Sequence, residues 1–394
     1  MNFEYALRRF LIKYARNLNL SCFEKVWVKN SNAFPAGLNL SLSLLCPSGC
    51  IFCAVRGPEI VPKIMPEDLF RKILQEARDH HFQGSFSLSQ NGEALTHPKF
   101  KDFFTLLREE FPKNEIILFS NMILMDKENA RFVLENGLDY LHFNLDGASP
   151  QTYDYIKRNG RFEQAWQNIL NFFRIREQLN ARCRVGIGYV TAARFSKEIE
   201  GKEGLMQDDE EEIRERLKPL LKKEDCIHPD LIGLEKYQWI LNRQKREPCD
   251  LFDRVLREIF IAPNGQVYIC CADFGVTSNL GNVNHQTIHS IWSSESRKAI
   301  LRNLFKVRMK SKINPEVCKT CIPCWFSSRS PDIYGKCKGK VRMEFVRGRL
   351  AFVNGTLKVM DKGEDSGDME KAMNESAGQG SEGGIYRTAE EDKR

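Results

Sequence analysis

Three cysteines that follow a short strand-like run set the strongest constraint on this chain of 394 residues. The run, residues 38–45, is apolar at alternate positions, which predicts a strand, and Cys46, Cys50 and Cys53 come directly after it. Thiolates at this spacing can bind three irons of a cubic iron–sulfur cluster and leave the fourth iron without a protein ligand. An iron with an open position can bind a substrate or cofactor, so the motif predicts a catalytic cluster.

Two other uses of these cysteines are less favoured. Tetrahedral thiolate sites also suit zinc, but zinc needs a fourth ligand, and the nearest downstream candidates are His80 and His81. Three clustered cysteines cannot all pair with each other as disulfides. The sequence also shows no export signal, because the apolar residues 10–12 end at Lys13, which is too short a run for a signal peptide.

The cysteine count and the hydropathy of the chain bear on where the protein works. Thirteen cysteines without an export signal indicate a reducing compartment and metal ligation rather than disulfides. No apolar run approaches the roughly 20 residues needed to cross a bilayer. We therefore expect a cytoplasmic protein.

The charge of the chain is +7, with basic clusters at 297–312 and 336–349. We interpret these clusters as a solvated positive face, and nucleic acid is not the expected partner. Residues 3–20 have the pattern of a basic amphipathic helix. We expect this helix to pack against the main domain; peripheral membrane contact through it is a less favoured alternative.

From residue 37 the chain alternates strand-like and helix-like segments, which predicts a parallel sheet with helices outside it. Further strands are expected at 85–89, 115–120, 140–145, 182–191 and within 225–237. Helices are expected at 65–79, 100–111, 127–136, 162–179 and within 196–224. Gly186 and Gly188 are expected to leave room for a ligand near the backbone. The Gly-, Ser- and acid-rich end, from about residue 361, is predicted to be disordered.

A second group of cysteines comes later in the chain and comprises Cys249, Cys270, Cys271, Cys318, Cys321, Cys324 and Cys337. Residues 260–270 contain an apolar segment, an Asn-Gly pair and a second apolar segment, which predicts a β-hairpin. This hairpin would bring Cys270 to a defined position.

Both cysteine groups resemble those of the radical S-adenosylmethionine (SAM) superfamily. The first loop, with Phe52 before its third cysteine, is similar to the superfamily signature. The later region resembles the SPASM domain of many members, or its shorter twitch form, through Cys249, Gly265, Cys270, Asp273, Leu280, Gly281, Asn282, Ile288, Ile291, Trp292, Arg302, Cys318 and Cys321. The resemblance covers about residues 37–325.

The resemblance implies an α/β fold, a partial (β/α)6 TIM-like barrel followed by a small cysteine-rich domain. We expect a basic N-terminal extension at 1–36, the radical SAM core at 37–237, a linker at 238–248, the auxiliary cluster domain at 249–340 and a C-terminal segment at 341–394.

The implied cofactors are SAM, a SAM-binding [4Fe–4S] cluster on Cys46, Cys50 and Cys53, and at least one auxiliary [4Fe–4S] cluster. The ligands that match a single-cluster twitch domain are Cys249, Cys270, Cys318 and Cys321, with Cys324 as an alternative. A two-cluster domain expects Cys-x2-Cys-x5-Cys-x3-Cys, whereas this chain has Cys-x2-Cys-x2-Cys. We therefore expect one auxiliary cluster.

The resemblance also implies a SAM site at the ends of the strands, formed by Asn91, Gly92, Glu93, Ser120, Asn121, Asn144 and Asp146. Asn91 replaces the first glycine of the family's Gly-Gly-Glu-like turn, and Glu93 is an expected partner for the SAM ammonium group. For Asp146, capping of the following helix is an equally weighted alternative. Asp273 is a candidate catalytic base, and His97 and His142 are expected to be structural.

The implied activity is reductive cleavage of SAM to a 5′-deoxyadenosyl radical, which removes a hydrogen atom from a substrate carbon. We expect a net oxidation of a small alcohol or sugar-like molecule or of a peptide, with a one-electron donor such as flavodoxin or ferredoxin. One alternative is a peptide-modifying maturase of the ribosomal-peptide or sulfatase type. An alternative of another class is an iron–sulfur or zinc protein that binds RNA without catalysis.

Overall fold

The computed structural model describes residues 34–50, 53, 63–88, 91–158, 161–189, 209–229, 252–271, 273, 278–308, 350–353 and 356–359. The predictions for the helix at 3–20, the linker, the end of the chain from residue 361, and Cys249, Cys318, Cys321 and Cys324 lie outside these ranges. Among the described helices, none is both long enough and apolar enough to span a membrane.

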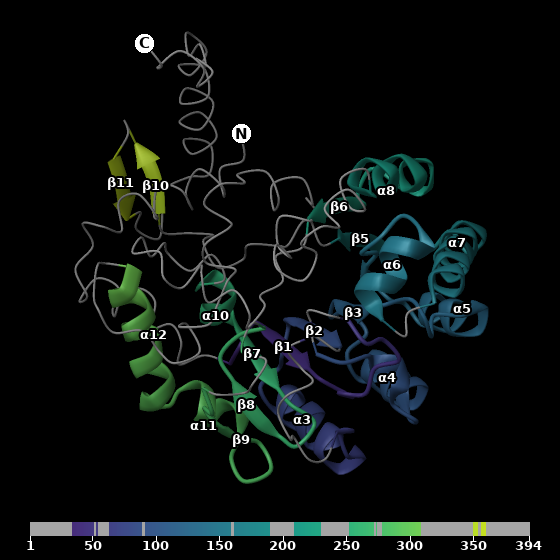
Figure 1. Cartoon of the computed structure of the whole chain (residues 1–394). Coiled ribbons are helices and arrows are strands. Elements are labelled where there is room, and N and C mark those ends of the chain that lie inside the picture. The colour runs from purple at the N-terminus through teal and green to yellow at the C-terminus, as the bar shows by residue number, and fades with distance from the viewer. Residues whose placement is uncertain are drawn as a thin grey trace, which may run out of the picture. The chain divides into compact units, whose positions relative to one another are not determined.

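Within the described residues, nine strands form one sheet in the order β6-β5-β4-β3-β2-β1-β7-β8-β9 (Figure 1). The strands are β1 (Gly37–Leu40), β2 (Ser85–Leu88), β3 (Ile116–Ser120), β4 (Tyr140–Asn144), β5 (Arg184–Tyr189), β6 (Cys226–Pro229), β7 (Glu258–Ile261), β8 (Gln266–Tyr268) and β9 (Gly281–Asn282). Strands β1 to β6 pair in parallel, and the sheet ends at β6 and β9 without closing. The expected partial barrel of six parallel strands is confirmed.

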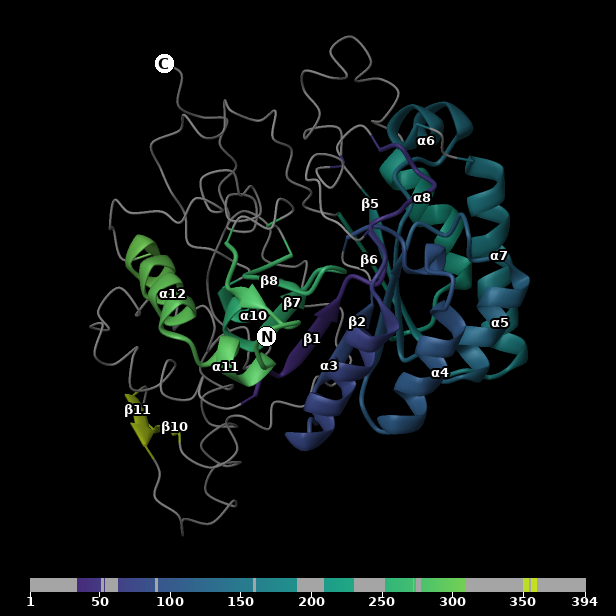
Figure 2. The same cartoon turned by 90° about the horizontal axis from the view of Figure 1, so that it is seen from below.

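Helices connect these strands. They are α3 (Glu67–Asp79), η4 (Ala94–Thr96), α4 (Phe100–Glu110), α5 (Lys127–Glu135), α6 (Pro150–Lys157), α7 (Phe162–Gln178), α8 (Asp209–Leu217), η7 (Lys218–Leu220), α10 (Phe252–Arg257), α11 (Ile288–Trp292) and α12 (Glu295–Arg308). Figure 2 shows α3, α4, α5 and α7 along one face of the parallel strands. Helix α6 was not predicted, although Ser149 caps it and Pro150 opens it, a common start signal.

The two faces of the parallel strands differ in chemistry. Toward the helices lie side chains that are at most 1% exposed: Leu38, Leu40, Phe86, Leu88, Ile116, Leu118, Leu141, Phe143, Val185 and Ile187. Successive side chains in a strand point to opposite faces, so the inner face of the open barrel carries Asn39, Ser41, Ser87 and His142, all of them buried. The inner face thus carries buried polar side chains next to apolar ones, since Phe260 pairs in register with Asn39 and Ile117 with Ser87.

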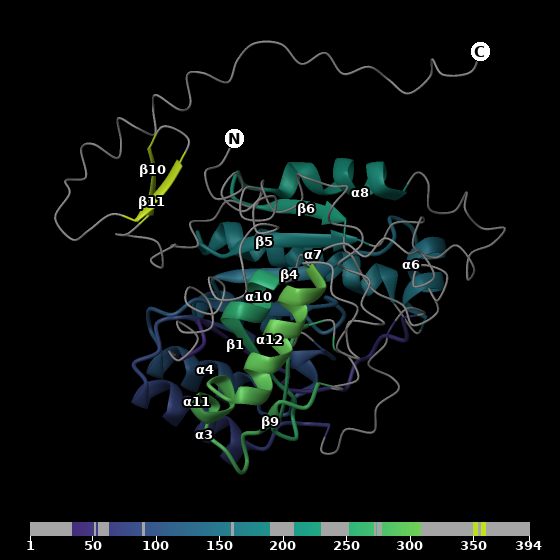
Figure 3. The same ribbon diagram turned by 90° about the vertical axis from the view of Figure 1, so that its left-hand side faces the viewer.

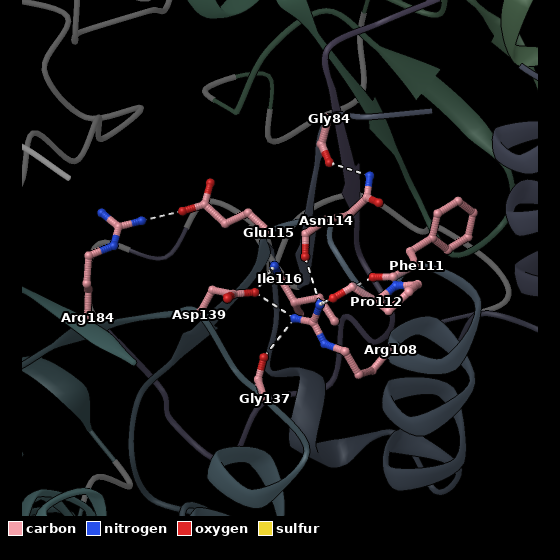
Figure 4. Close-up of polar contacts among 10 residues, drawn as sticks. All are labelled: Gly84, Arg108, Phe111, Pro112, Asn114, Glu115, Ile116, Gly137, Asp139 and Arg184. Carbon is pink, nitrogen blue, oxygen red and sulfur yellow. Dashed lines mark hydrogen bonds and ion pairs between the residues drawn. The ribbon is translucent and has the colours of Figure 1, made fainter. Parts of the chain in front are cut away.

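A network of hydrogen bonds and ion pairs connects the amino-terminal ends of the strands (Figure 4). Asp139 precedes β4, accepts a hydrogen bond from the Ile116 main-chain N–H at 2.9 Å, and lies 2.6 Å from an Arg108 nitrogen. Glu115, just before β3, pairs with Arg184 at the start of β5. Arg108 also donates to the carbonyls of Phe111, Pro112, Asn114 and Gly137. Because barrel enzymes place their active sites at the opposite, carboxyl-terminal end, this network serves stability.

The expected hairpin at 260–270 forms, and it joins the core sheet directly. Strand β7 lies parallel to β1, while β8 is antiparallel to β7. Helix α12 packs beside α10 (Figure 3), where the guanidinium of the buried Arg297 stacks 3.3 Å from the Trp292 ring centroid and donates to the Val255 carbonyl at 3.0 Å. The described part of residues 252–308 is thus continuous with the barrel.

Two further expectations from the sequence are corrected. The strand expected at 38–45 ends at Leu40, because Leu42 and Leu44 instead exchange main-chain hydrogen bonds with residues 63 and 65. The space beside Gly186 does not face a ligand, since a Cβ atom there would lie 1.8 Å from the Tyr140 hydroxyl.

The residues from 338 onward form a separate unit. Its described part is an antiparallel hairpin of β10 (Leu350–Val353) and β11 (Thr356–Val359), which the sequence did not lead us to expect.

Candidate active site

The cysteine loop leaves the carboxyl end of β1. Its base is held by main-chain hydrogen bonds from Leu44 to Lys63 and from Met65 to Leu42, both 2.8 Å. Cys46 is exposed, while Cys50 and Cys53 are half-buried. In the described part of the chain, no group of three or more His, Cys, Asp or Glu side chains has the arrangement of a metal site. The structure thus places the three thiols on one loop, close enough that the charges of Cys46 and Cys53 act on Cys50.

The surroundings of two of these thiols favour the protonated form. Burial raises the pKa of Cys50 to about 11, and protein atoms packed around the Cys46 sulfur raise the pKa of that thiol above its ordinary value. Thiols with raised pKa values are poor nucleophiles, whereas a bound metal ion deprotonates a coordinating thiol outright. The spacing of the three cysteines, and not these pKa values, is what supports an iron–sulfur cluster.

The turn after β2 lies against the start of this loop. The main-chain N–H of Glu93 donates to the Leu45 carbonyl at 2.9 Å. Gly92 has a φ of +75°, and a Cβ atom there would lie 2.1 Å from the Ser43 carbonyl oxygen. Both the backbone conformation and the close approach require glycine. The expected SAM-binding turn and the cysteine loop are therefore built as one unit.

Asn91 presents a buried acceptor in this turn. The residue is 4% exposed, and its Oδ1 atom has no hydrogen-bond partner among the described residues. An unpaired buried acceptor is costly unless a ligand satisfies it. The amino group of SAM carries N–H donors, so Asn91 Oδ1 fits that group.

Glu93 links the turn after β2 to the end of β3. Its fully buried carboxylate accepts hydrogen bonds from the Asn121 N–H at 2.8 Å and from the Ser120 hydroxyl at 3.2 Å. Burial raises its pKa to about 7, although these hydrogen bonds lower it in part. The carboxylate thus binds donors of the chain itself, and it holds two neighbouring strand ends together.

Asn121 reaches the cysteine loop. Its Nδ2 atom lies 3.3 Å from the sulfur of Cys46, and its Oδ1 atom accepts a hydrogen bond from the Ile123 N–H at 3.0 Å. Hydrogen bonds to the sulfur ligands are one of the means by which proteins tune the reduction potential of an iron–sulfur cluster. The structure therefore places Asn121 beside the expected cluster.

Asp146 forms a buried ion pair. Its Oδ2 atom lies 2.5 Å from the Nζ atom of Lys157, and both side chains are at most 3% exposed. The alternative that Asp146 caps the following helix is wrong, because the hydroxyl of Ser149 accepts from the Thr152 N–H at that position. Sequence reasoning missed Lys157. Asn144, also expected at this site, is half-buried at the last position of β4, opposite Gly188.

Asp273 organises the turn beyond Cys270. Its buried carboxylate accepts hydrogen bonds from the hydroxyl and from the main-chain N–H of Ser278, while its own N–H donates to the Cys270 carbonyl at 3.0 Å. Through these contacts Asp273 connects Ser278 to the backbone of Cys270, a candidate cluster ligand. His97, as expected, is structural: its ring bonds to the Met65 carbonyl and to the Lys99 N–H.

Two curated proteins match part of this chain. A GTP 3′,8-cyclase from Desulforamulus reducens is 25% identical over 171 residues, which are 41% of this chain and 52% of that protein. A biotin synthase from Citrifermentans bemidjiense is 28% identical over 123 residues, 28% of this chain and 36% of that protein. The chain therefore spans about half of the first relative and about a third of the second.

Solved structures with a related fold have low sequence identity to the chain. BtrN in complex with AdoMet and 2-DOIA is 14% identical, with 76% of this chain and 96% of that chain covered and a TM-score of 0.47. Streptococcus suis SuiB bound to the precursor peptide SuiA is 15% identical, with 77% and 76% covered and a TM-score of 0.48. Likeness at this level says nothing about substrate.

Family models match both cysteine regions. Residues 40–200, which include the Cys46 loop, the Asn91 turn and Asp146, match the radical SAM superfamily. Residues 249–322, which include Cys270 and Asp273, match the SPASM iron–sulfur cluster-binding domain. Membership of this superfamily implies an enzyme that uses SAM and a [4Fe–4S] cluster. The SPASM domain implies that the protein also binds an auxiliary cluster. The chain belongs to the radical SAM superfamily and carries a C-terminal SPASM domain.

Proposed function

We propose that this chain binds a [4Fe–4S] cluster through Cys46, Cys50 and Cys53, binds SAM next to that cluster, and removes a hydrogen atom from a substrate carbon. One observation carries the proposal. The cysteine loop, the Asn91–Glu93 turn and the end of β3 are hydrogen-bonded to one another at the carboxyl ends of neighbouring strands. Barrel enzymes assemble their active sites at this end of the strands.

Each of these residues has a distinct part in the proposed site. Asn121 donates a hydrogen bond to the Cys46 sulfur, and such a bond favours the reduced, more negatively charged form of a cluster bound there. Asn91 Oδ1 accepts from the N–H groups of the SAM amino group, and Glu93 joins the turn after β2 to the end of β3. When bound, the reduced cluster and SAM supply a 5′-deoxyadenosyl radical.

The auxiliary cluster is proposed to be bound by Cys249, Cys270, Cys318 and Cys321, with Cys324 as an alternative ligand. Cys270 is buried directly after β8, and β8 reaches the core through β7, which pairs with β1. A cluster there could accept an electron from a substrate radical. Flavodoxin or ferredoxin is the proposed one-electron donor for the first cluster.

The cysteine spacing of the auxiliary region, which matches a single-cluster domain, supports a small-molecule substrate. We propose a net oxidation of a small alcohol or sugar-like molecule; a peptide substrate is the alternative.

The test is SAM cleavage under anaerobic conditions, measured as 5′-deoxyadenosine formed after reduction. We expect the reconstituted protein to form it, Cys50→Ala to abolish it, and Cys183→Ala to leave it unchanged, because Cys183 directly precedes β5 and so lies at the amino-terminal ends of the strands. Adding polyols and peptides in turn should show which class raises the rate. Purified protein that holds zinc and binds RNA in a salt-sensitive way, without cleaving SAM, would replace this proposal with the RNA-binding alternative.

A further inference from the structure

Three polar side chains from distant parts of the sequence meet behind the Asn91 turn. Tyr268, on β8, accepts a hydrogen bond from Asn91 Nδ2 at 3.2 Å, and its hydroxyl oxygen lies 3.3 Å from the hydroxyl of Ser41, the residue that follows β1. Tyr268 and Ser41 are each 1% exposed, and Asn91 is 4% exposed. The contact is therefore shielded from water.

This contact fixes how the Asn91 amide is oriented. A tyrosine hydroxyl can take part in two hydrogen bonds at once, and the second partner of Tyr268 is the Ser41 hydroxyl. With Nδ2 bonded to Tyr268, the Asn91 Oδ1 atom is directed away from Tyr268, and it has no partner among the described residues. Rotation of the amide would place an acceptor where the turn now supplies a donor.

Tyr268 is also tied to the auxiliary region. It lies two positions before Cys270, and its ring lies 5.5 Å from that of Phe260 on β7. Strand β7 is in turn paired with β1, the strand that leads into the Cys46 loop. The hydroxyl of Tyr268 therefore connects β8, the strand that leads to the candidate auxiliary ligand Cys270, to the expected SAM-binding turn at Asn91.

We propose that Tyr268 is a positioning residue of the SAM site: it orients Asn91 Oδ1 toward the amino group of SAM and couples that subsite to the auxiliary hairpin. This inference rests on the proposed function. It assigns to the SAM site a residue from the SPASM region that contacts SAM only through Asn91.

The test compares SAM binding to wild-type protein and to Tyr268→Phe, both reconstituted anaerobically and kept oxidised so that no turnover occurs. The variant retains the ring and loses only the hydroxyl. Calorimetry should show SAM affinity reduced on the order of tenfold, the equivalent of about one net hydrogen bond, with iron content unchanged. The affinity for 5′-methylthioadenosine, which lacks the amino acid part of SAM, should not change.

A double-mutant cycle with Asn91→Ala distinguishes two causes of weaker SAM binding in Tyr268→Phe: loss of the Asn91 orientation, or a general loss of packing around residue 268. Once Asn91 is truncated, removal of the Tyr268 hydroxyl should cost no further SAM affinity, because the two residues act through one contact.

Equal SAM affinity in wild type and Tyr268→Phe, or additive losses in the cycle, would overturn the proposal. If Tyr268→Phe does not fold, Ser41→Ala tests the same hydroxyl from its other side and should weaken SAM but not 5′-methylthioadenosine. Wild-type protein that fails to bind SAM would instead refute the proposed function itself.

Discussion

The ammonium group of Lys157 lies 2.5 Å from the carboxylate of Asp146, with both side chains removed from solvent. Burial alone would lower the pKa of Lys157, but the Asp146 carboxylate reverses that effect and raises it above its ordinary value. The Lys157 carbonyl also accepts from the Gly49 N–H at 2.6 Å. One residue of α6 thus holds the end of β4 by its side chain and the Cys46–Cys50 segment by its backbone.

Loss of the Lys157 charge should destabilise the protein strongly. Lys157→Met would leave the Asp146 carboxylate buried without its cation, which costs about 3–5 kcal/mol. Anaerobic chemical denaturation should show this fall in the free energy of unfolding, and adding Asp146→Asn should recover part of it. The control is Lys99→Met, which breaks a pair of the same 2.5 Å length with Glu67 on the surface and should cost at most about 1 kcal/mol. Equal losses in the two variants would contradict this assignment.

Gly92→Ala should disrupt the site, whereas Gly137→Ala should only weaken the fold. Both glycines have φ near +75° to +78°, so both changes carry the backbone cost of about 1 kcal/mol for a left-handed residue. At Gly92 the new Cβ would also meet the Ser43 carbonyl at 2.1 Å, while at Gly137 its nearest neighbour is 3.4 Å away. We expect Gly92→Ala to lose SAM binding and Gly137→Ala to keep it, as measured by calorimetry. Retained SAM binding in Gly92→Ala would argue against the close packing of the turn on the loop.

The carboxyl group of Glu93 should make stability fall as the pH rises. Burial raises its pKa from 4.5 to about 7, so between these values the folded protein holds a proton that the unfolded chain has released. Stability is therefore lost progressively from pH 4.5 to about 7 and no further above that. At about 1.4 kcal/mol for each pH unit, the total is about 3 kcal/mol.

Glu93→Gln keeps an acceptor for the Asn121 N–H and cannot titrate. The difference in unfolding free energy between wild type and this variant should therefore change across that pH range and stay constant above it. Chemical denaturation of both proteins in matched buffers measures the difference. A difference that does not vary with pH would show that the Glu93 pKa is not raised.

The iron content of cysteine variants should distinguish the cluster site of the Cys46 loop from the auxiliary site. Replacing Cys46, Cys50 and Cys53 together by alanine should remove about four iron atoms per chain, the content of one [4Fe–4S] cluster, and leave about as many behind. Further replacement of Cys270 should remove the remainder. Iron and acid-labile sulfide assays measure both steps, and retention of about eight iron atoms after the first step would point to two auxiliary clusters.

The periodic segments of the fold could be predicted from the sequence to within a few residues. The expected helix at 100–111 is α4, Phe100–Glu110, and the expected strand at 115–120 is β3, Ile116–Ser120. Both have strong apolar periodicity, which depends on local sequence alone. Helix α6 was missed because it is eight residues long and carries only a narrow apolar stripe; its Ser-Pro start was the available signal.

The site could be predicted only in part. The cysteine loop and the Asn91 turn are local motifs, so their residues could be identified by spacing. The partners of these residues could not: Tyr268 and Asn91 are 177 positions apart, and their contact depends on β7 pairing with β1. Likewise Asp146 was identified, but its ion pair required knowing that α6 brings Lys157 back over the end of β4.

The most direct test of the proposed function is whether SAM binds the cluster of the Cys46 loop through its amino group. Electron–nuclear double resonance on the reduced protein, with SAM that carries an isotope-labelled amino nitrogen, measures the coupling between that nitrogen and the cluster spin. We predict a clear coupling in the wild type and in Cys270→Ala, and none in Cys50→Ala. A wild-type protein with an intact reduced cluster and no coupling to the labelled nitrogen would contradict the account.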